Sequence, residues 1–172
     1  MHIATIDLQT IPPKTRIMLR RSIGKDIASA GNAMGYFYAI KPPQITPYQE
    51  EALFACLTMA CQWNETDRST TLSLAQCLRT LVAAEKLNKN SIDRTMQTIL
   101  DCEWNPEHGN LLGIKLSRLV KQIRTKGMDT PDFEQLYYDL KNWNHPDKFI
   151  QKQWARDYFT TTKIEEDETD AV

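Results

Sequence analysis

The chain has 172 residues, is 41% hydrophobic and carries a formal net charge of −1, so it can bury its own core without a metal or disulfide. The four cysteines lack the paired short spacings of metal sites and disulfide frameworks, and no secretory signal precedes them. Both observations favour a reducing cytoplasm. Because no apolar run approaches the ~20 residues of a membrane-spanning helix, we also expect the protein not to enter a membrane.

Helical periodicity dominates the first hundred residues. Two capping boxes are the strongest signals, one joining Thr46 to Gln49 and the other joining Ser73 to Gln76. Gly24 ends the first, shorter helix, because glycine commonly terminates helices. Five helices are therefore expected, over residues of about 14–23, 34–40, 46–61, 73–85 and 90–100.

The loop WNPEHGN, residues 104–110, interrupts the helical pattern with a proline and a glycine. After it we expect a helix over 111–126, a helix capped by Thr130-Pro131 that runs to about Trp143, and a last helix that starts at 144–146. No alternating strand pattern or hairpin turn signal competes. The predicted fold is all-α, with seven to nine helices in two lobes, residues 1–104 and 105–162.

The C-terminal segment, residues 163–172, is acidic and too poor in apolar residues to fold alone, so we expect it to be disordered. Five of its residues are acids and follow the last base, Lys163. Without those five, 21 bases face 17 acids, which gives the remainder a net charge of +4. A body with this bias is suited to phosphate groups, although the bias is modest for a nucleic-acid-binding protein.

Catalytic and metal-binding patterns are missing from the sequence. None of His2, His108 and His145 has a second histidine or a carboxylate three or four residues away on one helical face. Cys56 and Cys61 lie among apolar residues, which favours a role as small core side chains. Walker A, GxGxxG and GxSxG motifs do not occur. We therefore predict no catalytic residue, no metal site and no cofactor.

The segment NLLGIKLSRLVKQIRTK, residues 110–126, contains five bases and no acid. Five apolar residues fall within a sector of roughly 100° of the helix, so this face must pack inward. They are Leu112, Leu116, Leu119, Val120 and Ile123. The bases avoid that sector, and their three-residue steps make them wind across the outer face. Phosphate backbones also wind, so we predict nucleic-acid contacts from Lys115, Arg118, Lys121 and Arg124.

A second basic segment lies near the N-terminus, where five bases occur between residues 14 and 25. Three of them, Arg20, Arg21 and Lys25, complete the predicted nucleic-acid-binding set. Two basic helices can line one groove and bind the phosphate backbone without reading sequence. The alternative for each is an ordinary solvated helix face.

Four segments carry a family resemblance over most of residues 15–160. They are Met18-Leu19-Arg20-Arg21-Ser22, Ser73-Leu74-Ala75, Arg118-Leu119-Val120 and Trp154-Ala155-Arg156-Asp157-Tyr158-Phe159. In this order they resemble the CasB family, the small subunit of the type I-E CRISPR complex Cascade. Arg20 and Arg21 match the basic pair of the family, and Arg118 matches a base on the helix after its central loop.

The resemblance implies a small helical protein without catalytic activity that contacts guide RNA and target DNA. It also implies three protein partners, namely the repeated backbone subunit, the large subunit and a second copy of the chain. The acidic tail has no counterpart in the family pattern. The main alternative is a helical scaffold that binds only proteins; a helical nuclease would require clustered carboxylates, which the predicted helices do not supply.

Overall fold

The computed structural model describes residues 1–160, so the expectation of a disordered tail over 163–172 lies outside the described residues. Eight α-helices form within them, which confirms the all-α prediction. They are α1 (Pro13–Arg21), α2 (Ala33–Ile40), α3 (Pro47–Ala60), α4 (Leu74–Ala83), α5 (Lys89–Asp101), α6 (Leu111–Thr125), α7 (Phe133–Asn142) and α8 (Phe149–Phe159). No helix among the described residues is long and apolar enough to cross a membrane.

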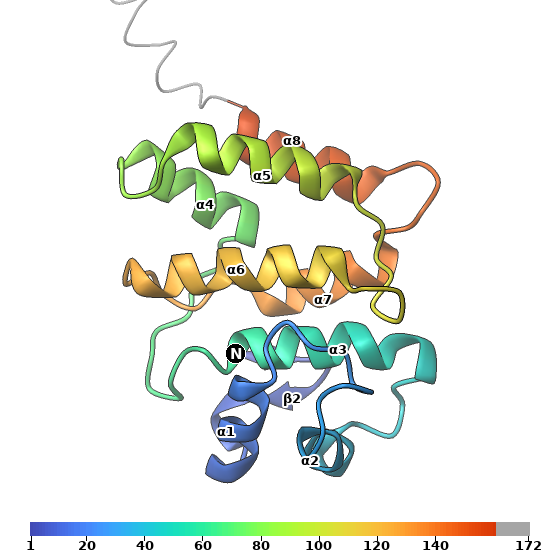
Figure 1. Ribbon diagram of the computed structural model, residues 1–172. Coiled ribbons are helices and arrows are strands. Elements are labelled where there is room, and N and C mark those ends of the chain that lie inside the picture. Colours follow the sequence, from blue (N-terminus) through green and yellow to red (C-terminus); the bar gives the residue numbers. More distant parts are fainter. Residues whose placement is uncertain (161–172) are drawn as a thin grey trace, which may run out of the picture.

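The helices form three tiers (Figure 1). One tier contains α1, α2 and α3, the middle tier contains α6 and α7, and the third contains α4, α5 and α8. In α3, every residue from Ala52 to Ala60 is buried, because helices and the N-terminal segment cover it on several sides. This central helix therefore positions the elements around it.

Helices from the two sides of residue 104 pack against each other. Helix α7 packs on α3, α8 packs on α4, and the buried apolar residues form one continuous cluster. The division into lobes at residues 104 and 105 stays a prediction, and these contacts show that the helices on its two sides share a core.

A two-stranded hairpin precedes α1, where no strand pattern was expected. Strand β1 (His2–Ile3) pairs antiparallel with β2 (Ile6–Asp7), and a short 3-10 helix, Leu8–Thr10, follows. The turn residues Ala4 and Thr5 have φ angles of 47° and 72°, a conformation usually supplied by Asn-Gly or Asp-Gly. The backbone N–H of Ala4 donates to Glu134 of α7 over 2.7 Å, so a distant residue helps to hold a turn that its own sequence does not favour.

Both predicted capping boxes, at Thr46 and at Ser73, are present. Two predicted starts later in the chain are wrong. Helix α7 is capped by Asp132 rather than by Thr130, because the Asp132 carboxylate accepts from the N–H of Gln135 over 3.0 Å. Helix α8 begins at Phe149, since residues 144–147 form turns that end at Lys148, where φ is 51°.

Candidate nucleic-acid interface

Three arginines converge on the C-terminal end of α3, where successive carbonyls are free to accept hydrogen bonds. Arg20 donates from Nε to the carbonyl of Cys61 over 2.7 Å, Arg124 from Nε to that of Gln62 over 3.1 Å, and Arg16 from Nη1 to that of Trp63 over 3.2 Å. The last carbonyls of an α-helix lack helical partners and carry partial negative charge, so guanidinium groups are suited to them. The cluster ties α1 and α6 to the same end of α3.

Two of the predicted nucleic-acid-binding residues, Arg20 and Arg124, thus have partners within the protein that the sequence did not predict. Arg20 also donates to the side chain of Asn64 over 3.2 Å, and Arg124 lies 3.5 Å from the Asp67 carboxylate. Their guanidinium groups position α1 and α6 and are less available to phosphates than freely exposed ones.

Arg16, which was not among the predicted site residues, is the most deeply placed member of the arginine cluster, at 6% exposure. It also donates to the carbonyl of Leu8 and lies 3.8 Å from Glu65. The available sequence signal was its spacing of four residues from Arg20, which puts both on one helical face beside the buried Leu19.

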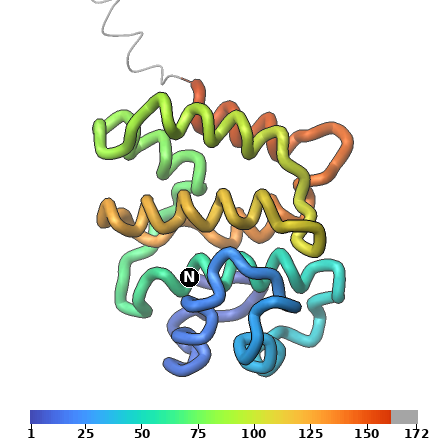
Figure 2. Tube along the Cα trace, viewed as in Figure 1, coloured from blue at the N-terminus to red at the C-terminus, as the bar shows by residue number. Residues whose placement is uncertain are grey.

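The segment that follows α1 lies against α6 (Figure 2). Gly24 has a φ of +82°, and a Cβ built there would lie 3.8 Å from the side chain of Ser117. Asn110, at the start of α6, donates from Nδ2 to the carbonyl of Gly24 over 3.3 Å. The two predicted basic segments are therefore adjacent at Asn110 and Ser117. At the other end of α6, Arg124 meets Arg20 only indirectly, because both arginines bind carbonyls that follow α3.

Lys121 lies on the stripe of α6 that contacts Gly24 through Ser117 and the end of α3 through Arg124, because these three residues of α6 are spaced by four and three. The stripe spans about 10 Å at 1.5 Å per residue. Lys121 is exposed, and so are the other residues of what we call the basic surface, which comprises Arg21, Lys25, Arg118 and Lys121. Within residues 1–160, no hydrogen bond or ion pair engages the charged group of any of these four.

Lys115, the remaining predicted site residue, differs from this group because it is half-buried and lies near Cys102 at the end of α5. It is not part of the basic surface. The four bases of α6 that were predicted to wind across its outer face therefore differ in their surroundings. Within the described residues only the middle two, Arg118 and Lys121, are both exposed and unpaired.

The described residues offer little for redox or metal chemistry. Burial raises the pKa of the Cys61 thiol to about 11 and that of Cys77 to about 12, and it raises the pKa of Cys56 well above its usual value. Thiols with such pKa values stay protonated at neutral pH and are weak nucleophiles. No group of three or more His, Cys, Asp or Glu residues in the described part of the chain is arranged to hold a metal ion.

Comparison with known protein families shows which family this chain belongs to. Residues 15–159, which run from α1 to the end of α8, match the family described as CRISPR-associated protein Cse2. The chain belongs to the Cse2 family. The resemblance to CasB is thereby confirmed, since CasB proteins are solved members of the same group. Comparison with curated proteins gave no significant match.

Solved structures share the fold of this Cse2-family chain. A chain of a CRISPR RNA-guided surveillance complex has a TM-score of 0.73 at 20% identity, covering 94% of this chain and 92% of the other. A Cse2-family protein from Thermus thermophilus has a TM-score of 0.67 at 20% identity, with coverage of 84% and 85%. CasB from M. ruber has a TM-score of 0.65 at 18% identity, with coverage of 94% and 91%.

Proposed function

We propose that this Cse2-family chain is a non-catalytic small subunit of a type I-E CRISPR surveillance complex in the cytoplasm. In this role it holds guide RNA and target DNA and stabilises the displaced-strand structure, the R-loop, through contacts that do not read sequence. The observation that carries the proposal is the adjacency of two basic segments at α6, which leaves Arg21, Lys25, Arg118 and Lys121 exposed and unpaired within residues 1–160.

Exposed cations of this kind bind nucleic acid by releasing counterions from phosphates, so binding is salt-dependent and sequence-independent. R-loop formation exchanges a DNA duplex for a hybrid of similar stability, and modest backbone contacts are enough to favour the product. Four exposed cations therefore suffice for a stabilising role, although they are too few for tight binding by the isolated chain.

The assembled complex supplies the rest of the affinity. Partner subunits, guide RNA and a second copy of this chain hold the basic surface at high effective concentration near the DNA, where weak contacts act together. Tight and salt-insensitive DNA binding by the isolated protein would contradict this part of the proposal.

Charge reversal tests the role of the basic surface. We expect Arg118→Glu combined with Lys121→Glu to weaken target-DNA binding by the assembled complex at least tenfold, because two favourable phosphate contacts become repulsive. The matched control is Lys86→Glu combined with Lys152→Glu, two exposed lysines that lie in or beside the tier of α4, α5 and α8. Unchanged DNA binding by the first variant, in complexes of normal composition, would overturn the nucleic-acid role and favour a protein-only scaffold.

The non-catalytic part of the proposal has a separate test. Labelled DNA incubated with the protein and with Mg²⁺ or Mn²⁺ is expected to remain intact, because the described residues contain no arrangement suited to metal-assisted hydrolysis. Cleavage of the DNA by an activity that stays with the protein through purification would contradict the non-catalytic role.

A further inference from the structure

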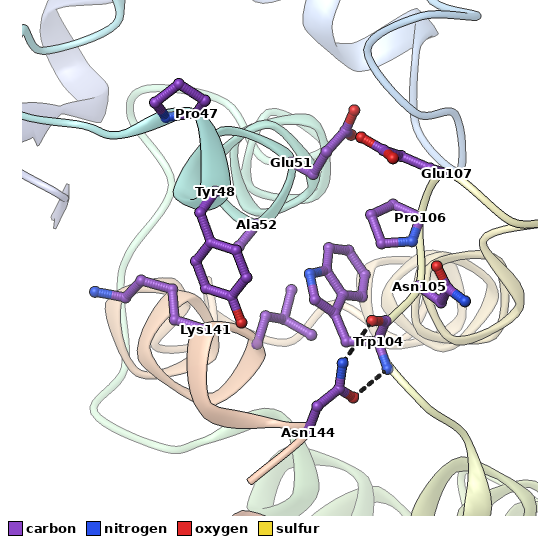
Figure 3. Close-up of a pocket in the computed structure, with 11 residues that line it drawn as sticks. Pro47, Tyr48, Glu51, Ala52, Trp104, Asn105, Pro106, Glu107, Lys141 and Asn144 are labelled. Carbon is purple, nitrogen blue, oxygen red and sulfur yellow. Dashed lines mark hydrogen bonds between the residues drawn. The ribbon is translucent and has the colours of Figure 1, made fainter.

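A pocket of about 220 Å³ lies at the N-terminal end of α3 (Figure 3). The arginine cluster lies at the other end of the same helix. The first turns of α3, the loop over residues 104–107 and the end of α7 enclose it. Ala52 and Leu140 contribute apolar lining. The 104–107 segment is more than a boundary between helices, because it forms one wall of this site.

Two aromatic side chains border the pocket. Tyr48 is 78% exposed, more than any other large apolar side chain among the described residues. Trp104 is fixed by Asn144, whose amide accepts from the backbone N–H of Trp104 and donates to its carbonyl, each over 2.8 Å. The pocket therefore has one aromatic border whose backbone is anchored and one aromatic border that water can reach.

The indole N–H of Trp104 distinguishes it from the other three tryptophans. Those of Trp63, Trp143 and Trp154 donate to Met128, Cys102 and Asp139, respectively. The indole N–H of Trp104 has no acceptor within residues 1–160, and its nitrogen lies on the side of the ring that faces Tyr48 (Figure 3). A ligand in the pocket can thus accept a hydrogen bond from it.

Two carboxylates, those of Glu51 and Glu107, lie together at one edge of the pocket (Figure 3). Burial raises the pKa of Glu51, and the negative charges of Asp26, Glu107 and Glu50 raise it further, although the N–H of Ile27 donates to its carboxylate. A cation placed beside these carboxylates would relieve their mutual repulsion.

The one lysine at the pocket does not neutralise this edge. The ammonium of Lys141 lies 4.1 Å from the ring centroid of Tyr137, and in Figure 3 it points away from the two carboxylates. The aromatic border and the acidic edge therefore remain available together to a cationic ligand.

We propose that this pocket binds an arginine side chain presented by a partner protein. A planar guanidinium stacks on aromatic rings and donates to two carboxylates at once, and the peptide carbonyl of the same residue can accept from the Trp104 indole. Nucleic acid is the less suitable occupant, because its phosphates would meet the Glu51 and Glu107 charges. The inference goes beyond the proposed function, since its ligand is a protein and its site lies at the other end of α3.

The test is a titration of the ¹⁵N-labelled full chain with N-acetyl-L-arginine N′-methylamide, followed by NMR of the four indole N–H signals. The Trp104 signal, assigned with Trp104→Phe, is expected to shift and saturate with a Kd on the order of 1–10 mM, as suits one side chain. The other three indole signals report whether the fold is kept. Glu51→Gln combined with Glu107→Gln is expected to weaken binding at least tenfold, whereas Glu85→Gln, an exposed acid after α4, is expected to leave it unchanged.

Three results would overturn the inference. The first is the absence of a Trp104 shift at about 20 mM blocked arginine, a concentration above the expected Kd. The second is an equal response to blocked lysine, because an ammonium does not stack as a guanidinium does. The third is a response to deoxyadenosine monophosphate that exceeds the response to arginine, which would assign the pocket to a nucleotide.

Discussion

Arg124 donates from its Nε to the carbonyl oxygen of Gln62 over 3.1 Å, which fixes the C-terminal half of α6 to the end of α3. The side chain of Gln62 in turn donates to the carbonyl of Arg20 over 3.0 Å, so α1 is held at the same point. The arginine cluster thereby sets the spacing between the two basic segments. Two of the bases predicted to bind nucleic acid, Arg20 and Arg124, thus bind the protein itself. They hold in place the helices that present the exposed bases of the basic surface.

Replacing Arg124 should therefore affect stability more than replacing Arg118. Arg124→Gln is expected to lower the free energy of unfolding by about 1–2 kcal/mol, because a charged hydrogen bond to a helix end is lost. Arg118→Gln removes an exposed, unpaired charge and should change it by less than about 0.5 kcal/mol. Urea denaturation of both variants measures the difference, and equal effects would show that Arg124 has no positioning role.

Arg16 is expected to be the most sensitive member of the arginine cluster. Arg16→Met leaves the carbonyls of Leu8 and Trp63 without their donor in a buried setting, so the loss should be about 3 kcal/mol. Arg94→Met, at an exposed arginine of α5, is the control. Thermal unfolding followed by circular dichroism compares the two, and a similar midpoint for both would contradict the structural role of Arg16.

Gly113 controls the contact between α6 and the segment after α1. A Cβ at this position would overlap the side-chain amide of Asn110, which donates to the carbonyl of Gly24. Gly113→Ala should cost about 1–3 kcal/mol and speed hydrogen exchange over residues 22–27. Gly35→Ala in α2, where a Cβ meets nothing within 4 Å, should instead be neutral or stabilising. Unchanged hydrogen exchange in Gly113→Ala would show that the contact between Asn110 and Gly24 does not keep residues 22–27 ordered.

Asp139 gives the protein a defined pH dependence. Burial raises its pKa from 3.8 to about 6, although Trp154 and Gln135 donate to the carboxylate over 2.7 Å and 2.8 Å. Since the folded pKa exceeds the unfolded one, the stabilisation by protonated Asp139 is complete below about pH 4 and is lost as the pH rises through about 6.

Asp139→Asn tests this, because asparagine resembles the protonated carboxyl at every pH. Relative to the unsubstituted protein, the variant should gain on the order of 2 kcal/mol in unfolding free energy between pH 4 and pH 7. Urea denaturation at the two pH values gives this change directly. A constant difference between the two proteins would mean that Asp139 does not titrate in this range.

The sequence by itself determined the features that depend on near neighbours. The capping boxes at Thr46 and Ser73 were predictable because each joins residues three apart in the chain. The apolar face of α6 was predictable for the same reason, since the period of one helix decides which of its side chains are buried.

Tertiary structure alone decided the features whose partners lie far away in the chain. The turn at Ala4 and Thr5 is held by Glu134, and Asn144, expected to start α8, instead fixes Trp104. Likewise, the sequence of α6 assigns its bases to the outer face but contains nothing about the end of α3. Whether an arginine of α6 faces solvent or binds a carbonyl depends on which helix end lies beside it in the folded protein. The end of α3 lies beside Arg124, whereas Arg118 faces solvent.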